Sequence, residues 1–238
     1  MKPKLYQYEA CPFCHKVKSI LDYKGIDYEK IEVHPLKKTE LAFSPGYRAV
    51  PIYMDSEGRQ VNDSTPIMRS IDAEFPEPRV FETAPQEIEA ENKWLAWSEG
   101  FVKGLPTAIY DTFPNALKSF DYITKVGKFS WFEKRMIKYS GALAMTLVAK
   151  KIKKREQIDQ PDLFLKEKAK EWADGLGARP FMGGNTPGGA DIAVFGITRA
   201  VAGLRAGELL EENLEFKTWM EKMKEAANTP KGLQYAKS

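Results

Sequence analysis

The sequence predicts a small α/β domain followed by an all-helical domain, and three observations along the chain support this division. In the first part, short runs of β-forming residues alternate with one amphipathic helical run. The proline-rich segment "PEPRVFETAP" then interrupts the chain at 76–85. Beyond this segment, apolar residues recur at helical spacing throughout. We therefore expect an α/β domain over 1–77, a linker over 78–87 and an all-α domain over 88–238.

The first predicted unit is a strand, a helix and a second strand. The run "KLYQY" at 4–8 is rich in β-forming residues, and "YEKIEV" at 28–33 alternates apolar and charged residues. Between them, Phe13 and Val17 begin an apolar pattern of helical spacing that stops at Gly25. This order favours a parallel crossover connection between the two strands.

The rest of the α/β domain is predicted to be a hairpin and a helix. "AVPIYM" at 49–54 predicts a third strand, and "DSEGRQ" at 55–60 predicts the turn that follows it. Gln60 and Val61 begin a short hairpin partner. The run at 63–75 then places its apolar residues on one face of a helix.

The second domain is predicted to be helical throughout, beginning with a helix in which Ile88, Leu95 and Val102 share one face. Further helices are expected at about 115–125, 131–155, 162–176, 190–205 and 215–227. The basic run "KKIKKR" at 150–155 is interpreted as the solvated end of a long helix rather than as a patch for an anionic partner.

Composition excludes several classes of protein. Lys and Arg number 36 and Asp and Glu 33, so the net charge of +3 indicates no nucleic-acid partner. The apolar run "ALAMTLVA" at 142–149 is far shorter than the roughly 20 residues that span a bilayer. We find no signal peptide or hydrophobic anchor in "MKPKLYQYEA". The two cysteines both lie in one motif, which excludes a disulfide-stapled secreted fold and predicts a reducing, cytoplasmic location.

That motif, Cys11-Pro12-Phe13-Cys14-His15, has three interpretations: a redox or nucleophilic thiol, half of a zinc site, or a covalent haem attachment of the C-x-x-C-H type. A structural zinc site needs four Cys or His ligands, and His34 is the one Cys or His residue of the sequence outside this motif. Covalent haem requires export, for which the N-terminus gives no signal. We expect no metal site.

The thiol interpretation fits the context of Cys11. A cysteine between a strand end and a helix start receives free backbone N–H groups and the positive end of the helix dipole, which stabilise the thiolate. Pro12 suits the first helical turn. Lys16 and Lys18 either add positive charge near the thiol or are simply exposed. His15 either tunes the dithiol or faces solvent, and we expect it to face solvent.

Two distant dipeptides could belong to the same site. Pro51 follows Val50 at the start of a predicted strand; an X-Pro bond is ordinarily trans, and only the position argues for cis. Asp63 and Ser64 open a predicted helix, where either could be an ordinary N-cap. Backbone N–H groups at a helix start also bind carboxylates. A cysteine, a strand edge and an anion site together suit a peptide thiol such as glutathione.

These motifs identify a resemblance. "YxxCPFC", "VPI" and "NDS", followed by a helical domain, resemble the glutathione S-transferase superfamily with a thioredoxin-like (glutaredoxin-like) N-terminal domain. Five blocks, in order, are similar to the membrane-associated prostaglandin E synthase type 2 family. They are "YQYEACPFCHKVK", "IEVHPLKKTELAFSPGYRAVPI", "SFDYITKVGKF", "KYSGALAMTLVAKKIKKR" and "RPFMGGNTPGGADIAVFGITR". One departure from the superfamily is Gly188, where a Ser or Thr would precede Asp191 in a helix-capping box.

The resemblance implies the residues of the site. Cys11 would be the catalytic thiol, Tyr8 would hydrogen-bond it, and Cys14 would be the less essential cysteine. The remaining side chains and backbone groups would hold glutathione. The implied catalytic residues are Cys11, Tyr8 and Cys14, and the implied glutathione-binding residues are Cys11, Phe13, Val50, Pro51, Asp63 and Ser64.

The resemblance also implies function. It suggests a glutathione-dependent isomerase, thiol transferase or conjugating transferase that acts on a small hydrophobic electrophile or a disulfide, and a homodimer, which is common in the superfamily. The expected lack of a membrane anchor is a departure from the membrane-associated relatives. It further implies non-covalent haem ligated by glutathione sulfur. The alternative is a non-catalytic module of the same fold that binds a partner or haem. A membrane-inserting relative would need a stronger apolar stretch than "KVKSILDY".

Overall fold

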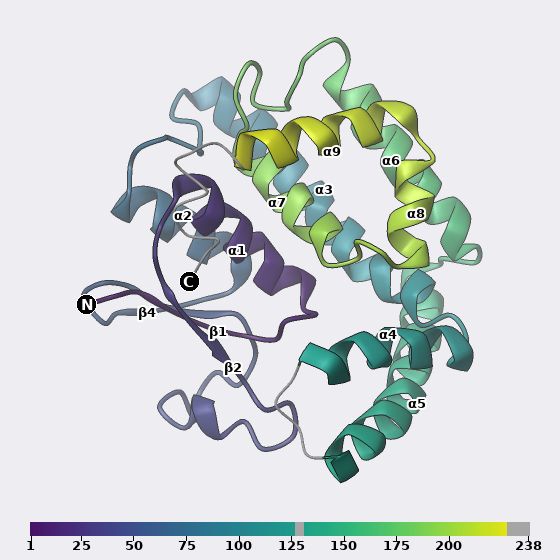
Figure 1. Cartoon of the computed structure of the whole chain (residues 1–238). Coiled ribbons are helices and arrows are strands. Elements are labelled where there is room, and N and C mark those ends of the chain that lie inside the picture. Colours follow the sequence, from purple (N-terminus) through teal and green to yellow (C-terminus); the bar gives the residue numbers. More distant parts are fainter. Residues whose placement is uncertain (127–130, 228–238) are drawn as a thin grey trace. The chain divides into compact units, whose positions relative to one another are not determined.

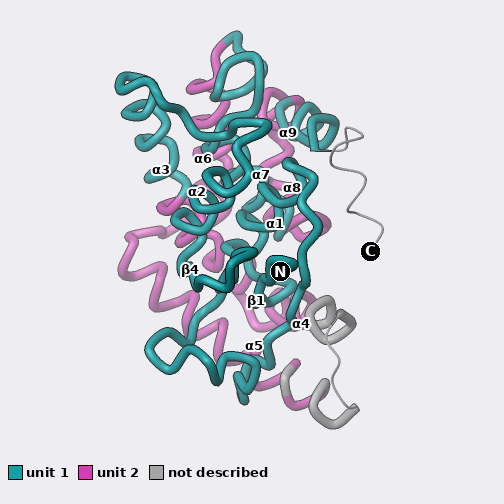
Figure 2. Tube along the Cα trace, turned by 90° about the vertical axis from the view of Figure 1, so that its left-hand side faces the viewer, with its two compact units in different colours: residues 1–98, 178–200, 219–238 teal, residues 99–177, 201–218 magenta. Residues whose placement is uncertain are grey.

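The computed structural model describes residues 1–126 and 131–227, with side chains described outside 121–126, 131–134 and 137. Contacts divide the chain into two compact units (Figure 2). Unit 1 comprises residues 1–98, 178–200 and 219–238, and unit 2 comprises residues 99–177 and 201–218. These units follow contacts rather than chain order, and the predicted division at 78–87 stays a prediction.

Unit 1 is built on a four-stranded sheet in the order β2-β1-β3-β4 (Figure 1). The strands are β1 (Lys4–Gln7), β2 (Glu29–Glu32), β3 (Ile52–Met54) and β4 (Gln60–Asn62). β1 pairs in parallel with β2 and antiparallel with β3, which pairs antiparallel with β4. The predicted parallel crossover and hairpin are therefore confirmed. β1, β2 and β3 are shorter than their predicted runs, and β4 begins at Gln60 as predicted.

The helices of unit 1 begin and end where local chemistry allows. In α1 (Pro12–Lys24), proline occupies the first turn, and Gly25 ends the helix at φ 68°, where its N–H donates to the Asp22 carbonyl. α2 (Ser64–Glu74) follows β4 and packs against α1. α7 (Gly189–Arg199) also packs against α1, although it lies far along the chain.

The start of α7 is fixed by a buried carboxylate. Asp191 accepts the backbone N–H groups of Met182, Gly183 and Gly188 at 2.9, 2.9 and 3.0 Å, and the Trp219 indole N–H at 2.9 Å. Gly188 is the N-cap, so the acidic half of the capping box is present, as the sequence indicates. Trp219 belongs to helix α9 (Leu214–Ala227), so Asp191 ties both this helix and one loop to the beginning of α7.

The remaining elements are helical, and η1 and α8 among them were not predicted as separate elements. They are η1 (Thr39–Leu41), a 3₁₀ turn, and the helices α3 (Pro85–Ile109), α4 (Phe113–Val126), α5 (Trp131–Glu156), α6 (Pro161–Leu176), α8 (Arg205–Glu211) and α9 (Leu214–Ala227). The single helix predicted at 190–205 is wrong. The chain breaks after Arg199, and Gly203 takes φ 76°, a conformation that stops a helix.

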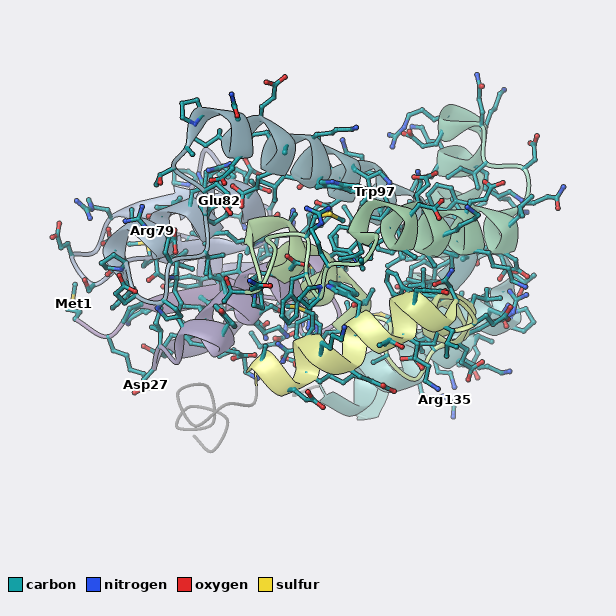
Figure 3. The ribbon with its side chains drawn as sticks, turned by 90° about the horizontal axis from the view of Figure 1, so that it is seen from above. Met1, Asp27, Arg79, Glu82, Trp97 and Arg135 are labelled. Carbon is teal, nitrogen blue, oxygen red and sulfur yellow. The ribbon has the colours of Figure 1, made fainter. Side chains whose placement is uncertain are left out.

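Charged side chains cover the surface. Asp27, Arg79 and Arg135 are exposed and point away from the ribbon (Figure 3). The predicted solvated end of a long helix is confirmed, since Lys153, Lys154 and Arg155 form the last turn of α5. Among the described residues, no helix is both long and apolar enough to cross a membrane.

Candidate functional site

Cys11 lies between the end of β1 and the start of α1. It is the N-cap of α1, in an extended conformation with φ −83° and ψ 119°. Its N–H donates to the Tyr8 carbonyl at 3.0 Å, and its carbonyl accepts the N–H of His15 at 3.0 Å. Residue Cys11 is partly exposed, whereas Cys14, one turn further along, is fully buried. Of the two cysteines, Cys11 is therefore the one with access to the surface.

The pKa values of the two thiols are shifted in opposite directions. A hydrogen bond from the Cys14 thiol lowers the pKa of Cys11, helped by the N–H groups of Cys14 and Phe13 and by the charge of Lys18. Burial raises the pKa of Cys14. Cys11 is therefore the more acidic of the two thiols, and Cys14 is the donor that favours its thiolate form, as expected for a thiol at a helix start.

A buried ionic cluster lies beneath this turn of α1. The Lys18 ammonium, 5% exposed, donates to Glu9 Oε1 at 3.2 Å. Although burial opposes it, a hydrogen bond from Gln7 and the charges of Lys18 and Lys30 lower the pKa of Glu9 to about 2. Glu9 therefore stays ionised and compensates the buried lysine.

The prediction that His15 faces solvent is wrong. His15 is buried, with Nε2 2.8 Å from the Glu9 carbonyl oxygen and 3.2 Å from Lys18 Nζ. Burial, followed by the charge of Lys18, lowers the pKa of His15 to about 3, so the ring is neutral at pH 7. Lys16 is also fully buried and donates to Thr65 Oγ1 at 3.1 Å.

Tyr8 follows β1 and packs, partly buried, beside Val50 on the cluster of Val33, Leu41 and Ile52. Burial, then the neighbouring charge of Cys11, raises the pKa of Tyr8 to about 12, so its hydroxyl keeps its proton. The contact that the structure gives between Tyr8 and Cys11 is through the backbone. The predicted hydrogen bond from the Tyr8 hydroxyl to the thiol stays a prediction.

The Val50–Pro51 peptide bond is cis, as its position predicts. It immediately precedes β3, whose Ile52 pairs with Tyr6 of β1. The backbone of Val50 therefore enters the sheet beside the carboxyl end of β1, where Tyr8 and Cys11 lie.

Asp63 is the N-cap of α2, but its side chain does not cap the helix. It takes φ 65° and ψ 138°, and its Oδ1 accepts the Tyr47 hydroxyl at 2.8 Å. Ser64 is the first helical residue and is buried. The ordinary N-cap interpretation thus holds for the position of Asp63 and not for its carboxylate.

Sheet register gathers the predicted residues. Tyr6 pairs with Ile52, and Ile52 pairs with Asn62. The carboxyl ends of β1 and β4 and the amino end of β3 therefore lie together at one end of the strands, which we call this edge of the sheet. Every predicted site residue follows or precedes a strand at that edge. They are Tyr8, Cys11, Phe13, Cys14, Val50, Pro51, Asp63 and Ser64. Sequence reasoning missed Tyr47 and Glu9, which sit in loops without a periodic pattern.

The rival interpretations of the cysteine motif find no support here. Covalent haem needs both thiols reachable, and Cys14 is fully buried. Within 1–126 and 131–227, no group of at least three His, Cys, Asp or Glu side chains could hold a metal ion.

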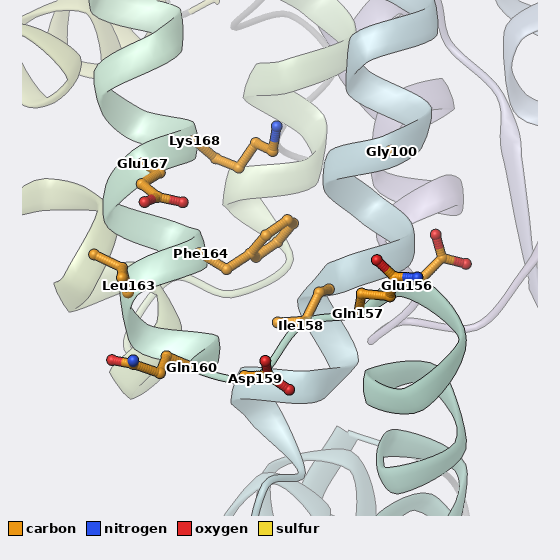
Figure 4. A pocket seen from close by; sticks show the side chains of 10 residues that line it. All are labelled: Gly100, Glu156, Gln157, Ile158, Asp159, Gln160, Leu163, Phe164, Glu167 and Lys168. Carbon is orange, nitrogen blue, oxygen red and sulfur yellow. The ribbon is translucent and has the colours of Figure 1, made fainter.

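Two cavities lie apart from these residues. One, of about 400 Å³ in unit 2, lies at the turn between α5 and α6, where Ile158 and Phe164 are flanked by Glu156 and Asp159 (Figure 4). The other, of about 310 Å³ in unit 1, is lined by residues of α3, among them Glu91 and Trp94, and by residues between Arg179 and Ala190. No predicted site residue lines either cavity.

Comparison with known proteins identifies the family. The glutathione S-transferase N-terminal domain family matches residues 5–79. Prostaglandin E synthase 2 of Mus musculus is 34% identical, over 93% of this chain and 69% of its own length. The chain belongs to the glutathione S-transferase superfamily. Prostaglandin E synthase 2 of Danio rerio is 31% identical to this superfamily member, over 95% of the chain and 71% of its own.

The fold of this superfamily member is shared with solved structures. A rice glutathione S-transferase in complex with glutathione superposes with a TM-score of 0.61 and 16% identity, covering 98% of this chain and 91% of the rice chain. The predicted thioredoxin-like, glutathione S-transferase-like fold class is thereby confirmed.

Proposed function

We propose that this chain is a glutathione-dependent transferase or isomerase whose reactive group is the Cys11 thiolate. The different environments of the two cysteines carry the proposal: residue Cys11 is partly exposed and its pKa is lowered, whereas Cys14 is fully buried and its pKa is raised. The names of its relatives, prostaglandin E synthase 2 and glutathione S-transferase, support the same enzyme class.

Glutathione would bind along the sheet edge that carries Cys11. Its cysteinyl part would pair with the backbone of Val50, next to Pro51, and Phe13, partly exposed in the first turn of α1, would line the pocket. Its γ-glutamyl carboxylate would receive the N–H groups that Asp63 leaves uncapped at the start of α2, and the Ser64 hydroxyl. The rice structure in complex with glutathione supports this ligand class.

For an endoperoxide, the chemistry needs no net oxidant. A thiolate attacks one peroxide oxygen, so that an S–O bond forms and the O–O bond breaks. The other oxygen leaves as an alkoxide and takes a proton, giving a hydroxyl. Loss of the proton on the carbon that bears the S–O group then forms the ketone and expels the thiolate.

For a disulfide, the Cys11 thiolate displaces one half as a thiol and forms a mixed disulfide with the other half. One glutathione displaces that second half as a thiol and leaves Cys11 disulfide-bonded to glutathione. A second glutathione then frees the Cys11 thiolate and leaves as oxidised glutathione.

Haem is not part of this proposal. His15 is buried, and its Nε2 lies 2.8 Å from the Glu9 carbonyl oxygen. His34 Nδ1 accepts the N–H groups of Leu36 and Lys37.

The proposal includes a cytoplasmic location, a homodimer, and the division of the chain into residues 1–77, 78–87 and 88–238. The location is supported by the two cysteines, which are both free thiols. The division is supported by the family match, which ends at residue 79.

The test is a panel of three reactions, each with glutathione: disulfide reduction, conjugation of an aromatic halide, and isomerisation of a prostaglandin endoperoxide. Wild type, Cys11→Ser and Cys14→Ser are compared. We expect Cys11→Ser to lose at least one activity by about 100-fold or more, since it removes the nucleophile, while Cys14→Ser retains most of it. Full activity of Cys11→Ser throughout, or none in wild type, would favour the non-catalytic module instead.

A further inference from the structure

Helix α5 carries a stripe of exposed apolar side chains. They are Met136, Tyr139, Leu143 and Leu147, which are 44%, 49%, 56% and 59% exposed. Steps of three, four and four residues place them on one side of the helix. Isolated apolar side chains are normal on a protein surface, but a contiguous group marks a surface that binds something.

The opposite side of α5 packs inside unit 2. Ala142 is fully buried in a cluster with Ala116 and Phe120 of α4, the neighbouring helix (Figure 1). The two helices approach closely, since a Cβ on Gly141 would come within 2.4 Å of the Phe120 ring. The exposed stripe is therefore not the face that holds α5 in the fold.

Positive charge continues the same face beyond the stripe. Lys150, Lys151 and Lys154 follow Leu147 by three, four and seven residues and are exposed. Within the described ranges 1–126 and 131–227, these three lysines form no ion pair. From 135 to 155 the sequence has Lys or Arg at 135, 138, 150, 151, 153, 154 and 155, and no Asp or Glu. The face is thus apolar at its centre and uniformly positive around it.

A second copy of the chain does not fit this face. If two α5 helices paired antiparallel, Lys150 and Lys154 of each would lie near Arg135 and Lys138 of the other. If they paired in parallel, each lysine would lie beside its equivalent. Both arrangements bring like charges together, which opposes association. A polynucleotide would use the cations and leave the apolar stripe in water.

A bilayer that contains anionic lipids offers both of the things that this face lacks. Its headgroup region carries negative charge, and a group of lysines on a helix is attracted to it by about 1 kcal/mol for each lysine near the surface. The boundary between headgroups and acyl chains accepts leucine, methionine and tyrosine side chains from a helix that lies flat. The long lysine side chains can reach the phosphates while the stripe lies deeper.

We propose that the exposed face of α5 binds peripherally to the surface of a bilayer that contains anionic lipids. Leu143 and Leu147 enter the headgroup boundary, and Lys150, Lys151 and Lys154 lie at the level of the phosphates. This contact needs no spanning helix or anchor segment, because an already folded helix makes it with one face. It goes beyond the proposed function, and no residue of the Cys11 site takes part in it.

The experiment measures flotation of the full chain with vesicles of phosphatidylcholine that contain about 30% phosphatidylserine. We expect wild type to float with these vesicles and not with phosphatidylcholine alone. Leu143→Gln combined with Leu147→Gln should weaken binding about tenfold, because apolar area no longer leaves water. Lys150→Gln, Lys151→Gln and Lys154→Gln together should weaken it about 100-fold. Salt at about 0.5 M should weaken wild-type binding by screening the lysines.

Matched control variants separate this face from general stickiness and net charge. Leu163→Gln combined with Leu214→Gln removes two exposed leucines of α6 and α9. Lys217→Gln, Lys222→Gln and Lys224→Gln together remove three exposed lysines of α9. Both controls should bind the vesicles as wild type does. All the substituted side chains are exposed, so every variant should keep the wild-type melting temperature, which thermal unfolding checks.

Three outcomes would overturn the proposal. Wild type could fail to float with the phosphatidylserine vesicles. The control variants could lose as much binding as the matched α5 variants, which would make the attraction one of net charge and not of this face. Light scattering could instead show that wild type self-associates and that Leu143→Gln with Leu147→Gln abolishes this without affecting flotation, which would assign the stripe to a second copy.

Discussion

Gly196 of α7 lies against the backbone of His15 in α1: a Cβ on Gly196 would come within 2.6 Å of the His15 carbonyl oxygen. The same Cβ would lie 2.6 Å from the Cα of Lys16. Neither atom is the flexible end of a side chain, so the two helices must separate to admit even a methyl group. This contact joins α7 to the helix that carries Cys11.

We therefore predict that Gly196→Ala destabilises the protein by about 1–3 kcal/mol, since overpacked interiors must shift backbone. Thermal unfolding measures it. Gly100→Ala is the control, because a Cβ at Gly100 in α3 meets nothing within 4 Å. That variant should be unchanged or up to about 1 kcal/mol more stable through helix propensity. Equal melting temperatures for the two variants would contradict the close approach.

The Glu9–Lys18 pair predicts a stability loss that a second substitution repairs. Glu9→Gln leaves the buried Lys18 ammonium without its carboxylate, which should cost about 3 kcal/mol at pH 7. Glu9→Gln combined with Lys18→Met removes both charges and should recover most of this loss. Urea unfolding of the single and double variants gives the values, and a double variant no more stable than Glu9→Gln would contradict the pairing.

The same pair sets a pH dependence. The pKa of Glu9 falls from its ordinary 4.5 to about 2 in the folded chain. A lowered carboxyl pKa stabilises the fold above the unfolded value, and the benefit is lost as pH falls through the folded value. The advantage of wild type over Glu9→Gln should therefore shrink between pH 4.5 and about pH 2.

The hydrogen bonds of Asp191 predict that substitutions around it differ in how much they destabilise the fold. Asp191→Ala leaves the N–H groups of Met182, Gly183 and Gly188 without their acceptor, and should destabilise by about 3 kcal/mol or more. Trp219→Phe removes only one of its donors, the indole N–H, and should cost less. Asp174→Asn, which loses an exposed ion pair with Lys170, should change stability by less than about 1 kcal/mol. Similar losses for Asp191→Ala and Asp174→Asn in chemical unfolding would contradict the role of Asp191.

Local pattern was enough to predict the strands, their order of appearance and most helices. Strand alternation, the stop at Gly25 and the proline punctuation act over a few residues and are visible in sequence. The break between α7 and α8 was missed because apolar spacing continues across it. Gly203, at φ 76°, lies in this turn. A glycine in the sequence does not by itself show whether its φ is positive, so the turn could not be predicted from it.

The buried charges of the site could not be predicted in the same way. Lys16 and Lys18 flank Val17 in sequence and look like a solvated face. The buried ammonium of Lys16 donates a hydrogen bond to Thr65, and that of Lys18 donates one to Glu9. Both partners lie outside α1, so the spacing within this helix does not indicate them. Tyr47 was missed for the same reason, since its partner, Asp63, lies beyond two strands.

Cys14 should control the reactivity of Cys11 through its thiol proton. Cys14→Ala removes the donor that lowers the pKa of Cys11, so that pKa rises. The thiolate is the reactive form and its fraction grows as pH rises through the pKa, so the rate profile must move to higher pH. We expect the pH profile of Cys11 alkylation by iodoacetamide to move to higher pH in Cys14→Ala than in wild type.

Cys14→Ser is the matched variant, because its hydroxyl can still donate to Cys11 and its profile should shift less than that of Cys14→Ala. Cys11→Ser supplies the background: its remaining thiol, Cys14, is fully buried and has a pKa raised by burial, so alkylation should be negligible. If the profiles of wild type and Cys14→Ala coincide, Cys14 does not stabilise the thiolate. The lowered pKa would then have to come from the backbone N–H groups of Cys14 and Phe13 and from the charge of Lys18.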